Sequence, residues 1–67
     1  MYIKTVQVLP TGMFWRVRTN SNAREVPFRT EKEALAHAIQ IARDERPSTV
    51  EEVTPDGHVM VVAQYRL

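Results

Sequence analysis

A chain of 67 residues, of which 43% are hydrophobic, can build one small core, so we expect a single domain over residues 1–67. It contains no cysteine, which excludes disulfides, thiolate metal sites and cysteine nucleophiles and leaves self-association as a way to enlarge the core. The net charge of +1 is uneven, because residues 1–30 hold five basic groups and one acid whereas residues 31–67 hold four basic groups and seven acids.

The chain begins with signals for a β-hairpin. Residues 2–9 are rich in β-branched side chains, which predicts a strand. Residues 10–12 read Pro-Thr-Gly and favour a turn, because proline fixes its φ and glycine accepts a positive φ. Residues 13–19 then alternate between two faces, which predicts a second strand.

The alternation in this second strand predicts which side chains face the core. The core-facing set is Met13, Trp15 and Val17. We expect Trp15 to be largely buried between the sheet and a helix. Residues 24–28 predict a short third strand, which Pro27 confines to a sheet edge or a bulge because proline cannot donate to a ladder.

A helix follows the third strand. Thr30 and Glu33 have the spacing of a capping box, in which the threonine hydroxyl accepts from a first-turn N–H and the glutamate reaches back to the cap. We expect the helix to run from Glu31 to about Glu45 and to end before Pro47. Its apolar side chains occupy one arc of about 160°, enough to cover one sheet face. They are Ala34, Leu35, Ala38, Ile39, Ile41 and Ala42.

The C-terminal third predicts a second hairpin. Residues 49–54 favour a fourth strand, Pro55-Asp56-Gly57 a tight turn, and residues 58–66 a last strand. The order is therefore β-β-β-α-β-β. It predicts an α+β domain, with a small antiparallel sheet and one amphipathic helix on one of its faces.

The ordered motifs resemble those of a bacterial family catalogued as domain of unknown function 2188. The resemblance covers nearly the whole chain and implies an α+β fold, with no biochemical activity to carry over. The matching motifs are Gly12 followed by Trp15-Arg16-Val17, Phe28-Arg29-Thr30 leading to Glu33-Ala34, the alanine-rich helix to Ala42-Arg43, and Asp56-Gly57 with Tyr65 near the end.

The chain is also similar to HicB-type antitoxin domains, on a smaller set of residues. Those domains place a Gly-x-x-Trp/Tyr-x-Val hairpin before a Thr-x-x-Glu-Ala helix, which here correspond to Gly12-x-x-Trp15-x-Val17 and Thr30-x-x-Glu33-Ala34. This resemblance implies a toxin-binding partner as one alternative function.

The residues that could support catalysis do not converge. His37 lies at the margin of the apolar arc of the helix, and His58 follows a turn, where a solvated side chain is expected. Glu51 and Glu52 are neighbours in a strand and so face opposite ways. We therefore expect no enzyme, no metal, no cofactor and no small-molecule substrate.

A nucleic-acid contact is a second alternative function. Phe14, Arg16 and Arg18 alternate onto one face of the second strand, opposite Trp15. Single-strand binders combine aromatic rings that stack on bases with arginines that follow the phosphates. The competing interpretation is that the arginine stems cover the sheet while their charges pair with acids of the fourth strand.

The last strand favours self-association. One helix covers one sheet face, so a strand of a monomer should alternate, yet residues 59–63 are apolar without a break. We expect Met60 and Val62 on the face opposite Val59, Val61, Ala63 and Tyr65, where they would join Phe14 in a dimer interface. Because no run approaches the roughly 20 apolar residues of a membrane span and no signal-peptide pattern follows Met1, the prediction is a cytoplasmic homodimeric interaction module.

Overall fold

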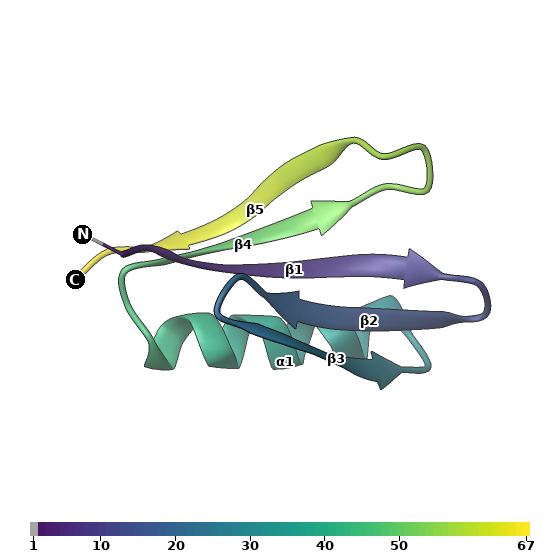
Figure 1. The fold of residues 1–67 in the computed structure, drawn as a ribbon, viewed down its shortest axis with the longest axis horizontal. Coiled ribbons are helices and arrows are strands. Elements are labelled where there is room, and N and C mark those ends of the chain that lie inside the picture. The colour runs from purple at the N-terminus through teal and green to yellow at the C-terminus, as the bar shows by residue number, and fades with distance from the viewer. Residues whose placement is uncertain (1) are drawn as a thin grey trace.

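A five-stranded sheet and one helix form two layers (Figure 1). The computed structural model describes residues 2–67, with Ala23 described through its backbone alone. The α+β class and the β-β-β-α-β-β order are confirmed. The elements are β1 (Lys4–Thr11), β2 (Phe14–Thr19), β3 (Asn22–Phe28), α1 (Glu31–Asp44), β4 (Ser48–Val53) and β5 (Val59–Tyr65).

The strand order in the sheet is β3-β2-β1-β4-β5, and the prediction of a wholly antiparallel sheet is wrong at one place. The β1–β2, β2–β3 and β4–β5 pairs are antiparallel, whereas β1 and β4 are parallel. The cause is α1, which carries the chain back along the sheet, so that β4 runs in the same direction as β1 and beside it. The sheet is therefore mixed.

The first hairpin turns over two residues. Thr11 pairs with Phe14, so the turn consists of Gly12 and Met13, and Gly12 takes the positive φ of 64° that glycine tolerates. Met13 therefore lies outside β2, with 90% of its surface exposed. Its predicted place in the core is wrong.

The core lies between α1 and the centre of the sheet. Its buried members are all small: Val6, Val8, Val17, Ala34, Ala38, Ala42 and Val50. Alanines on the inner face of the helix let it approach the valines closely. Trp15 is on the helix side, as predicted, but it is only half-buried and packs at the rim of this cluster.

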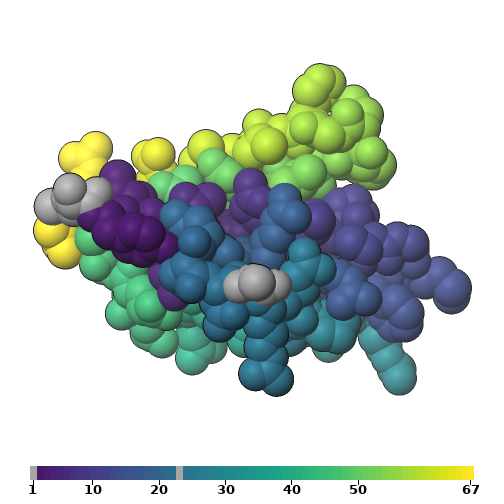
Figure 2. Space-filling view, viewed as in Figure 1, coloured from purple at the N-terminus to yellow at the C-terminus, as the bar shows by residue number. Residues whose placement is uncertain are grey.

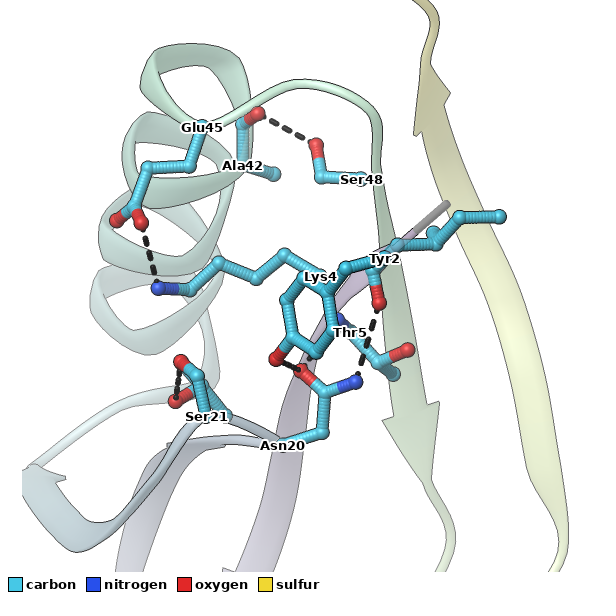
Figure 3. Close-up of polar contacts among 10 residues, drawn as sticks. Tyr2, Lys4, Thr5, Asn20, Ser21, Ala42, Glu45 and Ser48 are labelled. Atoms are coloured by element: carbon cyan, nitrogen blue, oxygen red, sulfur yellow. Dashed lines mark hydrogen bonds and ion pairs between the residues drawn. The ribbon is translucent and has the colours of Figure 1, made fainter.

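A set of polar contacts fixes the strand ends around the chain termini (Figure 3). The Asn20 side-chain oxygen accepts from the Thr5 N–H at 2.9 Å and from the Tyr2 hydroxyl at 2.7 Å, and its amide donates to the Ile3 carbonyl at 3.1 Å. Nearby, the Lys4 ammonium lies 2.7 Å from a carboxylate oxygen of Glu45, just after α1. These contacts join β1 to the β2–β3 turn and to the end of the helix.

A β-bulge in β5 changes which side chains share a face. Val50 pairs with Ala63 but Glu51 pairs with Val61, so Val62 is an extra residue on β5. The alternation of β5 side chains between the two faces of the sheet therefore shifts by one residue at Val62. Met60 therefore shares the helix side of the sheet with Ala63 and Tyr65, whereas Val59, Val61 and Val62 lie on the opposite side, which we call the open face. The predicted grouping of Met60 with Val62 is wrong.

Candidate functional site

Exposed apolar side chains gather on the first half of β5. Four consecutive residues are about half exposed: Val59 at 52%, Met60 at 52%, Val61 at 55% and Val62 at 44%. We call these four residues the β5 patch. They include Met60 and Val62, two of the three residues predicted for a dimer interface. A continuous apolar patch on a small protein commonly marks an interaction surface.

The β5 patch is exposed because the helix does not reach it. Ala63 and Tyr65, in the second half of β5, pack against the core cluster. The first half continues into the β4–β5 turn, which rises away from α1 (Figure 1) and projects from the body of the molecule in the space-filling view (Figure 2). Met60, although on the helix side, therefore has no helix over it.

The two edge strands of the sheet differ in how they are protected. Natural sheets protect edges from unwanted pairing with charged side chains, proline and bulges. One edge strand is β3, which carries Arg24, Glu25 and Pro27. On β5, the other edge, no side chain from residue 59 to residue 64 is ionisable and none is proline. The bulge at Val62 is the one such device between these residues, and it leaves Val59, Met60 and Val61 as an uninterrupted apolar edge.

The third predicted interface residue, Phe14, lies elsewhere. Phe14 is 47% exposed, on the open face, and is the first residue of β2, where Thr11 is its partner. Two strands, β1 and β4, separate β2 from β5 in the sheet. Phe14 is therefore not part of the β5 patch, although it shares the open face with Val62.

The arginines predicted beside Phe14 do lie on the open face, but their contacts are within the sheet. The Arg18 guanidinium donates to the Gln7 side-chain oxygen at 2.9 Å, and the Gln7 amide donates to a Glu51 carboxylate oxygen at 2.8 Å. A carboxylate oxygen of Glu25 lies 3.8 Å from Arg18. The acid beside Arg18 is therefore on β3, not on the fourth strand as the competing interpretation predicts, and Glu51 of β4 is linked to Arg18 only through Gln7. We call Glu25, Arg18, Gln7 and Glu51 the polar ladder.

Arg16 is also held within the sheet. Its Nε donates to the Thr11 hydroxyl at 3.0 Å, and its side chain is half-buried. An aromatic ring and two guanidiniums therefore share one face, as the alternation predicted, while both arginines already have partners.

The histidines lie in unrelated surroundings. The His37 ring is tilted against the Phe28 ring, with 5.0 Å between their centroids. In the β4–β5 turn His58 Nδ1 lies 3.0 Å from Asp56, whose pKa is lowered mainly by a hydrogen bond from the Thr54 hydroxyl. Among residues 2–67 as described, no group of three or more histidine, aspartate and glutamate side chains could hold a metal ion.

The comparisons with known proteins identify the family. A family model described as an uncharacterised protein conserved in bacteria (DUF2188) matches residues 6–60. The chain belongs to the DUF2188 family. The matched DUF2188 region runs from β1 into the start of β5, so it includes Val59 and Met60 of the β5 patch. No curated protein and no solved structure matches the chain.

In the described part of this DUF2188 protein, no helix is long and apolar enough to cross a membrane.

Proposed function

We propose that this DUF2188 protein is a non-enzymatic interaction module of the cytoplasm that forms a homodimer through the β5 patch. The observation that carries the proposal is the run of four half-exposed apolar side chains on a sheet edge. Burying apolar surface contributes roughly 25 cal/mol per Å², and the small valine and alanine core leaves this chain with little stability from its own folding. Self-association adds apolar burial where the fold alone does not supply it.

The test is the solution mass as a function of concentration. Light scattering and sedimentation from a few to several hundred micromolar should show a monomer that converts to a dimer as the concentration rises. The double variant Met60→Lys/Val62→Thr should stay monomeric over the whole range, because it places a charge and a hydroxyl in the buried contact.

Met13→Lys is the matched control. It also replaces an exposed methionine by lysine, but in the β1–β2 turn, and it should dimerise like the parent. Circular dichroism of each variant separates loss of dimer from loss of fold. A parent that keeps the monomer mass at several hundred micromolar would overturn the proposal.

One observation favours a second candidate, a contact with single-stranded nucleic acid. Phe14 is 47% exposed on the same face as Arg16 and Arg18, so a base could stack on its ring. Retention on single-stranded DNA or RNA that weakens with salt, and that Phe14→Ala abolishes, would support this function, since phosphate contacts release counterions. The antitoxin-like alternative predicts instead a stable complex when the chain is co-expressed with a small toxin encoded beside it.

A further inference from the structure

We infer that two copies of this chain pair through the exposed edge of β5, antiparallel, with the two-fold axis at Met60. This inference rests on the proposed homodimer and states its geometry. Val59 of each copy would lie opposite Val61 of the other on the open face, and the two Met60 side chains would meet on the helix side. The result is one continuous sheet of ten strands, with both helices on the same side.

The distribution of the β5 patch favours an edge contact. Met60 lies on the helix side of the sheet, and Val59 and Val61 lie on the open face. A partner stacked on either face would cover one set and leave the other in water. A strand added at the edge places a neighbour beside both sets, because paired residues of adjacent strands have side chains on the same side about 5 Å apart.

Stacking two copies face to face is less favourable than pairing their β5 edges, whichever face of the sheet is used. The helix side is occupied by α1 over the central strands. The open face carries the polar ladder across its middle, so stacking two open faces would bury Arg18 and Glu51. Burying charged groups costs several kcal/mol per ion unless each is fully paired. The edge of β5 avoids this cost, because no ionisable group lies between residues 59 and 64.

Charge at the strand ends supports a second copy of the same chain as the partner. Asp56 and Arg66 flank β5 at its two ends, and both are exposed. In an antiparallel pair, the Arg66 end of one copy runs toward the turn that holds Asp56 in the other. Opposite charges then approach each other twice, once on each side of the two-fold axis.

The bulge determines the register. In a regular antiparallel pair, opposite residues have their side chains on the same face. An axis at Met60 satisfies this rule for residues 59–61. An axis at Val61 or Val62 would set Met60 opposite a residue of the open face, because the alternation restarts at the bulge. The uninterrupted apolar half of the strand can therefore pair with itself over three residues.

Single cysteines test this register directly, because the chain has none of its own. Residues on the axis have their Cα atoms about 4.5–5.5 Å apart, within the range of a disulfide. Met60→Cys should therefore form a disulfide-linked dimer under mild oxidation, at least tenfold faster than Met13→Cys at the same concentration. Val59→Cys or Val61→Cys alone should react slowly, because the Cα atoms of the same residue in the two copies are about 8 Å apart, beyond the range of a disulfide. An equimolar mixture of these two should link rapidly.

The mixture gives a readout even if the Met60 variant does not fold. If light scattering shows a dimer while neither Met60→Cys nor the mixture crosslinks faster than Met13→Cys, the edge register is overturned and the proposed dimer stands. If Gln64→Cys forms disulfide-linked dimers fastest, the register is also overturned, because that result places the two-fold axis in the second half of β5. A chain that stays monomeric overturns the dimer and this register together.

Discussion

The carboxyl group of Glu52, on β4, lies close to the carboxyl group of Glu31, the first residue of α1. Two carboxyl groups can share a hydrogen bond only when one of them holds the proton. Partial burial, such a hydrogen bond and the repulsion from Glu31 raise the pKa of Glu52 above its ordinary value of 4.5.

This pair predicts that Glu52→Gln stabilises the protein at neutral pH. The folded chain binds the Glu52 proton more tightly than the unfolded chain, so the stabilisation from it is present below pH 4.5 and is lost as pH rises through the raised pKa. Glutamine keeps a donor for Glu31 at every pH. The variant should gain a few tenths of a kcal/mol at pH 7, the size of a like-charge pair on a surface, and the gain should shrink in acid.

Urea unfolding at pH 4 and pH 7 measures this difference. Glu51→Gln is the matched control, because Glu51 is next along the same strand but faces the open side and accepts from Gln7. It should bring no gain at pH 7. A Glu52→Gln variant that is less stable than the parent at pH 7 would show that the Glu52 charge is favourable in the fold.

Trp15→Ala is expected to destabilise the domain by about 2–3 kcal/mol. Full burial would make the loss of a tryptophan cost about 3–5 kcal/mol, and Trp15 is half-buried at the rim of the core. Met13→Ala, two residues earlier and 90% exposed, should change the free energy of unfolding by less than about 0.5 kcal/mol. Equal thermal midpoints for Trp15→Ala and the parent would contradict a packing role for the ring.

Ser48→Ala should cost about 1–2 kcal/mol. The Ser48 side chain is buried, and its hydroxyl donates to the Ala42 carbonyl in the last turn of α1 (Figure 3). A buried carbonyl left without this partner keeps its full desolvation penalty. Ser21→Ala removes an exposed hydroxyl that contacts Thr19 and should be close to neutral. Chemical denaturation of both variants compares the two serines, and a neutral Ser48→Ala would mean that water or a shift of the helix end replaces the bond.

Local signals predicted the elements of this fold well. The helix was expected from Glu31 to about Glu45 and runs to Asp44, because its cap, its apolar arc and Pro47 are all encoded within a few residues. Residues 10–12 predict the turn between β1 and β2 close to its true place, but Pro10 and Thr11 belong to β1 and the turn consists of Gly12 and Met13. Trp15 and Val17 face the helix as their alternation predicts.

Long-range pairing was not predictable in the same way. The parallel register of β1 with β4 joins residues about 44 positions apart, and a periodicity within either strand does not encode it. The bulge at Val62 is hidden because residues 59–63 are all apolar, so a shift of one residue leaves the pattern unchanged. For the same reason the apolar run indicated an interaction surface but assigned Met60 to the wrong side. The Glu31–Glu52 pair depends on this tertiary arrangement as well.

The start of the helix gives the last prediction, a double-mutant cycle on Thr30 and Glu33. The Glu33 N–H donates to the Thr30 hydroxyl oxygen at 3.1 Å, and that hydroxyl donates to the Glu33 carboxylate at 3.0 Å. Thr30→Ala should cost about 1 kcal/mol, with a range of about 0.5–2, because the first-turn N–H loses its acceptor. Glu33→Ala should cost less, because the Thr30 hydroxyl still accepts from the backbone. The two losses should not add, since both substitutions remove the same hydroxyl–carboxylate contact. Thr30→Ser should keep most of the stability. Strictly additive losses in urea unfolding would mean that the two side chains act independently in solution.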